Sequence, residues 1–129
     1  MVIEVRCSDR RGFTVIELLV VLAVVGLLVA VVAPRYTQHV DRARETALRQ
    51  NLAAIRQAID QFRADRSRYP VGIEELVSAR YLPRVPLDPV TERPDTWIAT
   101  QRESGEAGMT DVRSGAPGVA IDGTPYAAL

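Results

Sequence analysis

The chain has 129 residues, a formal net charge of zero and one cysteine, so it has room for one modest domain beside an anchor. The even charge balance gives no support for a nucleic-acid-binding class, and a single thiol excludes a framework of internal disulfides. The balance conceals a segregation, because no residue from Leu18 to Ala33 has a polar side chain. A membrane class therefore has to be considered first.

The apolar run extends from Phe13 to Ala33 and is interrupted only by Thr14 and Glu17. As a helix it is about 31 Å long, close to the thickness of a bilayer core. A secretory signal peptide has a shorter apolar stretch and a small-residue cleavage site, and neither is found here. Three basic residues precede the run and predict a cytoplasmic N-terminus and an exported C-terminal part. They are Arg6, Arg10 and Arg11.

A plain single-span anchor does not explain Glu17. A carboxylate inside a membrane span costs about 2.5–3.5 kcal/mol on insertion scales, so it favours a functional role. The alternative is a side chain near the helix end that simply reaches the lipid headgroups. Glu17 alone does not decide between the two.

The segment 10–19 reads RRGFTVIELL and resembles the type III signal of type IV pilins and type II secretion pseudopilins. The resemblance implies that a prepilin peptidase cuts after Gly12 on the cytoplasmic face and N-methylates Phe13. Glu17 is fifth from Phe13, where this family has a glutamate. Gly26 and Pro34, fourteenth and twenty-second from Phe13, also fall on typical pilin positions.

The resemblance implies that Glu17 pairs with the amine of Phe13 in a neighbouring subunit and sets the register of a fibre. Opposite charges attract strongly at low dielectric, which suits this role. Pro34 lacks an amide hydrogen and clashes with the preceding turn, so a kink is expected near Gly26–Pro34. The alternative is that Pro34 marks the end of the membrane helix.

Beyond the apolar run, hydrophobic residues recur at steps of three and four, so one long helix is predicted from about Thr14 to about Asp65. Tyr69-Pro70 must stop it. A short helix over Ile73–Arg80 and strands over Thr96–Thr100 and Met109–Arg113 follow, with a further short strand near Val119–Ile121. Trp97 is predicted to be the main core aromatic and His39 a surface residue. The predicted stripe comprises Val40, Ala43, Ala47, Leu48, Leu52, Ile55, Ile59 and Phe62. Ion pairs are expected between Asp41 and Arg44, Glu45 and Arg49, and Arg56 and Asp60.

The second half is similar to the G-type, or major, pseudopilin of type II secretion. The matching motifs are Tyr69-Pro70, Tyr81-Leu82-Pro83, Pro86-Leu87-Asp88-Pro89, Asp95-Thr96-Trp97 and Asp122-Gly123-Thr124-Pro125-Tyr126. This resemblance implies a Ca²⁺ ion in the C-terminal loop, for which Asp111 and Asp122 are the nearest candidates. The alternative is that both aspartates are turn or strand-end residues.

These observations predict an α+β, type IV pilin-like fold, with one long N-terminal helix, transmembrane and then amphipathic, packed on a small antiparallel β region and a loop-rich C-terminus. The expected parts are a cleaved leader (1–12), a transmembrane and assembly helix (13–34) and a periplasmic domain (35–129). The expected function is that of a structural pseudopilus subunit of the inner membrane, not an enzyme. Its expected partners are the prepilin peptidase, other pseudopilins, an assembly platform and its ATPase, but no nucleic acid. The alternatives are a type IV or competence minor pilin and a membrane-anchored periplasmic binding domain that does not polymerise.

Overall fold

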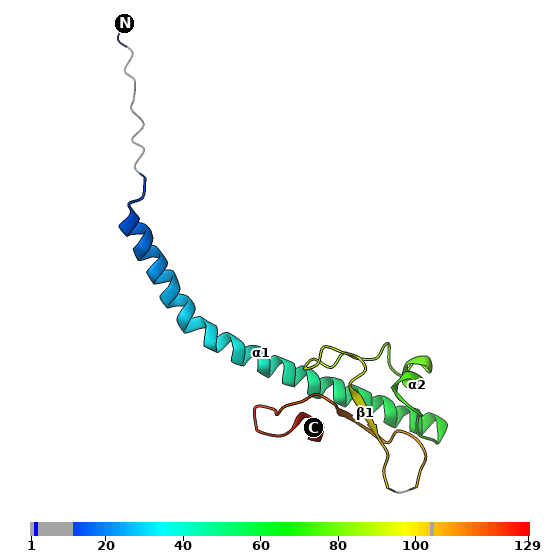
Figure 1. The fold of residues 1–129 in the computed structure, drawn as a ribbon. Coiled ribbons are helices and arrows are strands. Elements are labelled where there is room, and N and C mark those ends of the chain that lie inside the picture. Colours follow the sequence, from blue (N-terminus) through cyan, green and yellow to red (C-terminus); the bar gives the residue numbers. More distant parts are fainter. Residues whose placement is uncertain (1, 3–11, 104) are drawn as a thin grey trace. The chain divides into compact units, whose positions relative to one another are not determined.

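The structure is a computed structural model that describes residue 2, residues 12–103 and residues 105–129. Cys7 and the three arginines before the apolar run lie outside the described residues, as does most of the expected leader. The chain divides into two compact units, Met1–Gln38 and His39–Leu129. Figure 1 shows the elements in chain order. They are the helices α1 (Val15–Arg66) and α2 (Ile73–Ser78), the strands β1 (Trp97–Thr100) and β2 (Asp111–Ser114), and a 3₁₀ turn (Tyr126–Ala128).

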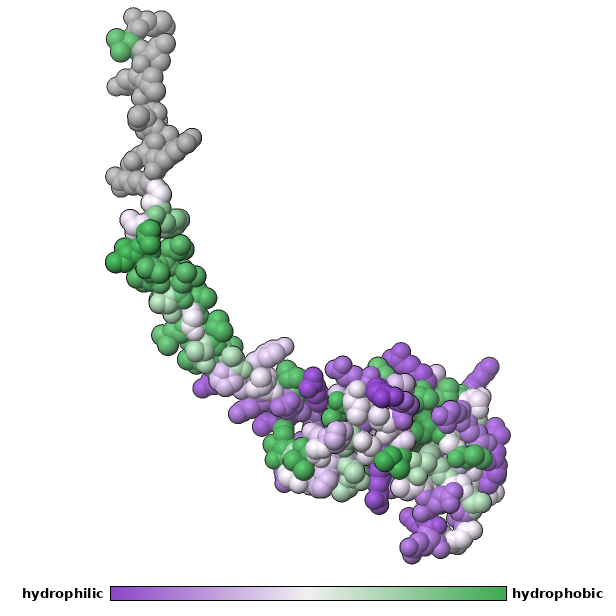
Figure 2. All heavy atoms as spheres, viewed as in Figure 1, coloured by the Kyte–Doolittle hydropathy of each residue, from purple (hydrophilic) through white to green (hydrophobic). Residues whose placement is uncertain are grey.

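The first unit contains the apolar start of α1. This part of the helix is long and apolar enough to cross a membrane, and none of its most apolar stretch is buried within the chain. Figure 2 shows hydrophobic residues covering it, whereas polar residues are frequent on the second unit. A helix that is apolar on every side requires an apolar surrounding, either lipid or other helices.

The second unit is built on the amphipathic part of α1. Leu48, Leu52, Ile55, Ile59 and Phe62 are almost completely buried, which confirms the predicted stripe over these turns. The stripe begins later than predicted, because Ala43 is exposed and Val40 only half-buried. It also includes a residue that the prediction omitted, the buried Ala58.

The prediction that Trp97 is the main core aromatic is wrong. Phe62 is the fully buried aromatic, and it packs edge-to-face on Tyr81 with ring centroids 5.4 Å apart. Trp97 is partly buried at the edge of the core, where its Nε1 donates to the carbonyl of Pro86 at 2.7 Å. A Trp ring keeps this edge position because its N–H needs a hydrogen-bond partner. His39 is exposed, as predicted.

Each helix is followed closely by a residue in the left-handed conformation. α1 ends at Arg66, close to the predicted limit, and the next residue, Ser67, has φ of 54°. α2 ends two residues before the predicted Arg80, which has φ of 66°. The amides of Arg80 and Tyr81 donate to Val77 and Leu76 in the pattern of a Schellman motif, which satisfies the last carbonyls and reverses the chain.

The sheet is a two-stranded antiparallel ladder that pairs Trp97 with Ser114 and Thr100 with Asp111. β2 starts two residues later than predicted, because the amide of Met109 donates instead to the carbonyl of Pro70 at 2.7 Å. The predicted strand at Val119–Ile121 is wrong. Only an isolated bridge joins Val119 to Pro125, since a tight turn over 120–124 takes the intervening amides.

An ion pair between Arg68 and Glu75 stabilises the start of α2. Arg68 donates to both carboxylate oxygens of Glu75, at 2.5 and 3.3 Å, and the amide of Val71 donates to Glu75 Oε2 at 2.7 Å. Hydrogen bonds from Arg68 and then from Val71 lower the pKa of Glu75 below 4.5, its ordinary value. Contacts that favour the ionised form stabilise the fold only while the carboxylate is ionised.

Asp88 is the one buried carboxylate among the described residues. Its Oδ1 accepts a hydrogen bond from the amide of Val90 at 2.8 Å, and its Oδ2 accepts one from the hydroxyl of Ser114 at 2.5 Å. Its own backbone pairs with Arg93. A single side chain therefore joins the loop before β1 to the end of β2.

The lowered pKa of Glu75 predicts a pH dependence. Glu75 should contribute its full stabilisation above pH 4.5 and lose it as the pH falls through its lowered pKa. The measurement is an NMR titration of the Glu75 carboxyl carbon in detergent micelles. Arg68→Gln should move the pKa back toward its ordinary value, and Arg84→Gln, a change of an exposed arginine elsewhere, should leave it unchanged. An unchanged pKa in Arg68→Gln would contradict the assignment.

Asp88→Ala should lower the free energy of unfolding by about 2–3 kcal/mol, because it leaves buried donors without an acceptor. Chemical denaturation of the full chain in detergent can be followed by fluorescence of Trp97, the only tryptophan. The control is Asp95→Ala, which removes an exposed carboxylate paired with Arg93 and should change stability by less than about 0.5 kcal/mol. Equal effects of the two substitutions would show that Asp88 does not hold the loop.

Candidate functional site

The predicted cleavage site lies just before the first turn of α1. Gly12 and Phe13 have no helical or strand conformation, and both are exposed, Phe13 to 91%. A Cβ added to Gly12 would meet nothing within 4 Å among the described residues. The described part of the chain therefore gives no packing reason for a glycine at this position.

Glu17 makes a contact that the sequence analysis missed. Its Oε2 accepts a hydrogen bond from the amide of Thr14 at 2.9 Å, and the hydroxyl of Thr14 accepts one from the amide of Glu17 at 3.3 Å. This reciprocal pair is a capping box, and Thr14 is the N-cap of α1. The spacing of Thr14 and Glu17 is the T-x-x-E signature, so the sequence did contain the signal.

The capping box places the Glu17 carboxylate at the N-terminal end of α1. The partial positive charge of a helix N-terminus stabilises an anion there. In the single chain, Glu17 is thus a hydrogen-bonded capping group on the exposed side of the first turn, with apolar residues around it. They include Phe13, Ile16, Val20 and Val21.

Gly26 and Pro34 both lie inside α1, which continues through Pro34. Pro34 therefore does not end the helix, and the predicted kink stays a prediction. A Cβ on Gly26 would meet nothing within 4 Å in the described chain outside the helix's own backbone. A mid-helix glycine costs about 1 kcal/mol relative to alanine, and no contact in the described chain explains it.

The two predicted calcium ligands are each held by an arginine. Asp111 Oδ1 accepts from Arg56 Nε at 2.8 Å, and Asp122 Oδ2 lies 3.4 Å from Arg49 Nη2. The amide of Thr124 donates to Asp122 Oδ1 at 2.9 Å, and this bond is the main cause of the lowered pKa of Asp122. The expected pair of Arg56 with Asp60 is replaced by the pair with Asp111, whereas the pair of Glu45 with Arg49 is confirmed.

This donor set does not fit a calcium ion. Calcium takes six to eight oxygen ligands, commonly including several carboxylates. Among the described residues, no group of three or more acidic, histidine or cysteine side chains is placed to hold a metal. Each of the two aspartates instead faces a guanidinium, whose positive charge opposes a nearby dication.

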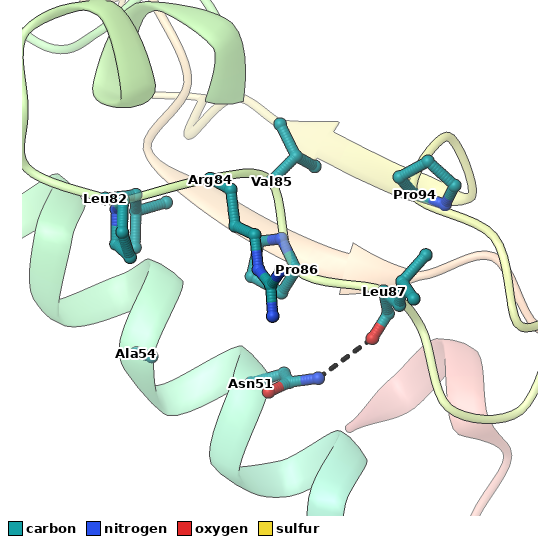
Figure 3. Close-up of a pocket in the computed structure, with 9 residues that line it drawn as sticks. Asn51, Ala54, Leu82, Arg84, Val85, Pro86, Leu87 and Pro94 are labelled. Atoms are coloured by element: carbon teal, nitrogen blue, oxygen red, sulfur yellow. Dashed lines mark hydrogen bonds between the residues drawn. The ribbon is translucent and has the colours of Figure 1, made fainter.

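A shallow groove of about 640 Å³ lies between α1 and the proline-rich loop after α2. In Figure 3, Asn51 reaches from α1 to the carbonyl of Leu87, to which its amide donates at 2.9 Å. The lining is apolar apart from Asn51 and Arg84 and includes no acid, histidine or thiol. The groove therefore has no side chain suited to acid–base or nucleophilic catalysis at neutral pH.

Comparison with known proteins identifies the N-terminal signal. Residues 7–33 match the family described as the prokaryotic N-terminal methylation motif. The chain is 30% identical to the type II secretion system core protein G of Klebsiella pneumoniae, over 90% of this chain and 88% of that protein. It is 32% identical to the protein of the same name from Klebsiella michiganensis, over 65% and 70% of the two chains.

A type IV pilin matches over a shorter stretch. The type IV major pilin protein PilA of Myxococcus xanthus is 36% identical over 46% of this chain and only 27% of its own length. No solved structure gives a significant match. The match to the Klebsiella pneumoniae protein covers most of both chains and therefore includes both units. Together with the methylation motif and the long helix packed on a two-stranded sheet, it shows that this chain belongs to the family of type II secretion system core protein G, the pseudopilins of the type IV pilin superfamily.

Proposed function

We propose that this chain is a structural subunit of a type II secretion pseudopilus. It is inserted in the inner membrane, processed by a prepilin peptidase and polymerised to help export folded proteins. The observation that carries this proposal is the capped carboxylate of Glu17 at the start of an otherwise apolar helix, at the fifth position after the Gly12–Phe13 junction. The names of the relatives and the methylation motif support it.

Processing removes residues 1–12 and N-methylates Phe13. The junction is exposed and lies outside the helix, as a protease substrate must be. Because the described chain gives no packing reason for Gly12, we assign the glycine to recognition by the peptidase, whose cleft admits a residue without a side chain. The product is a new α-amino group on Phe13.

Assembly uses this amine. A cation at the N-terminal end of a helix is unfavourable, because the helix dipole has the same sign there. The Glu17 carboxylate of a neighbouring subunit neutralises it, and methylation keeps it cationic. Gly26, for which the described chain offers no packing contact, suits the close approach of a second helix in the fibre.

The span over residues 13–34 keeps the N-terminus cytoplasmic and residues 35–129 periplasmic, following the arginines before the run. The energy for extraction from the bilayer comes from partners, because the sequence contains no phosphate-binding loop. An inner-membrane assembly platform and its ATPase fill this role. The chain itself is the substrate of the peptidase and not an enzyme.

The native N-terminus provides the first test. Intact-mass and peptide mass spectrometry of protein purified from membranes should find a chain that begins at Phe13 and carries one methyl group. In Gly12→Val, processing should be lost and the full leader retained, because a side chain at this position blocks the peptidase cleft. An unprocessed wild-type chain in the native membrane would refute the proposal and favour an anchored domain that does not polymerise.

Glu17→Val provides the second test. It should be processed normally but should reduce the yield of sheared fibres at least about tenfold, because the amine of Phe13 loses its partner. The matched control is Glu103→Val, which removes an exposed carboxylate from the second unit and should leave the yield unchanged. Normal fibre yield in Glu17→Val would refute the assembly contact. Fibres that form only with type IV pilus components would favour the minor pilin alternative.

A further inference from the structure

A row of charged residues on α1 faces the C-terminal segment of the second unit. Glu45, Arg49 and Arg56 are spaced by four and seven residues, so they lie on one side of the helix. All three bind residues between 111 and 129, at sequence separations of 55 to 76. These contacts are additional to the apolar stripe that forms the core.

Arg56 brings together oxygens from two distant parts of the chain. Its Nε donates to Asp111 Oδ1 at 2.8 Å, and its Nη2 donates to the main-chain oxygens of Val112 at 3.1 Å and Leu129 at 2.7 Å. β2 and the last residue are therefore fixed to the same guanidinium. Its side chain is 39% exposed, and its planar arrangement of five donors suits several acceptors at once.

Arg49 and Glu45 hold the turn between these two points. Arg49 Nη2 lies 3.0 Å from Glu45 Oε1 and 3.4 Å from Asp122 Oδ2. The second carboxylate oxygen of Glu45 accepts from the amide of Ile121 at 2.9 Å. The side chain of Glu45 is only 13% exposed, whereas Ile121 lies on the surface.

We propose that the guanidinium of Arg56 binds the C-terminal segment, residues 111–129, to α1 in place of a calcium ion. The pair of Glu45 and Arg49 supports this attachment. The ligands of the guanidinium are a carboxylate oxygen and two main-chain oxygens, the kinds of ligand that calcium would take. A covalently attached cation is always present. The C-terminal segment therefore stays bound to α1 at any calcium concentration.

The test is hydrogen–deuterium exchange, read by mass spectrometry, on the full-length chain in detergent micelles. It needs no fibre assembly, so its result is separate from that of the proposed function. In the wild type, peptides covering residues 109–129 should exchange at the same rate in millimolar calcium and in excess chelator. Greater protection of these peptides in calcium would overturn the proposal.

Arg56→Ala should speed the exchange of the peptides covering 109–114 and 125–129 at least about tenfold, because charge-assisted hydrogen bonds are lost. Peptides from α2 report whether the core stays folded. Arg56→Lys keeps the charge but not the fork of donors, and it should restore only part of the protection. The matched control is Arg93→Ala, which breaks an exposed pair with Asp95 outside this segment and should change nothing there.

Arg49→Ala is a second variant, for use if Arg56→Ala does not fold. It removes only the exposed contacts to Glu45 and Asp122, and it should speed exchange over residues 118–124 while the rest of the domain stays protected. Wild-type exchange over 109–129 in both Arg56→Ala and Arg49→Ala would overturn the proposal.

Discussion

The second unit depends on the apolar stripe of α1. Its two strands have four residues each, and the stripe from Leu48 to Phe62 supplies five of the large, fully buried side chains. A two-stranded ladder is at best marginally stable alone, so β1 and β2 hold their place because they pack against this helix. The same helix, nearer its start, is apolar on all sides and meets lipid or other helices instead.

A domain with so little regular structure needs other means to fix its loops. Several side chains on α1 and in the loops bind main-chain groups far away in sequence, as Asn51 does with Leu87 and Arg56 with Leu129. Asp88, in the loop before β1, makes its distant contact with a side chain instead, the hydroxyl of Ser114. Within the described residues, every buried side-chain nitrogen or oxygen has a hydrogen-bond partner. Polar contacts thus fix the loops, and the apolar stripe holds the elements together.

The features that were predictable from the sequence are those set by local spacing. The long helix, the buried stripe and the order of the short elements follow from hydrophobic periodicity and prolines. The early end of α2 was not predictable, because nothing local announces that Arg80 takes a left-handed conformation. The partner predicted for Arg56 is wrong for a related reason. Asp60 is close in sequence, whereas Asp111 becomes close only when β2 folds back on α1.

The position of Arg56 nevertheless contained a hint. It lies four residues after Leu52 and three before Ile59, at the margin of the buried stripe. A charged side chain at this margin is less hydrated than one on the fully exposed side of the helix. An arginine in such a place usually has a partner in the element that covers the stripe. The prediction for Trp97 is wrong because it considers only the large apolar ring. The N–H of the ring needs an acceptor, and it finds a carbonyl at the edge of the core.

The capping box changes the physical meaning of the proposed assembly contact. Before the cut, the nitrogen of Thr14 already gives Glu17 a hydrogen bond, so the carboxylate has no strong need for a neighbour. The cut leaves this bond in place and creates a cation one residue earlier, where the helix dipole opposes it. The newly formed group that requires a partner is thus the amine of Phe13. Glu17 can accept from its own Thr14 and from a neighbour's amine together, since a carboxylate has about four acceptor positions. On this argument, cleavage changes the charge of the subunit's end while α1 keeps its cap, so the helix start remains ordered when the neighbour arrives.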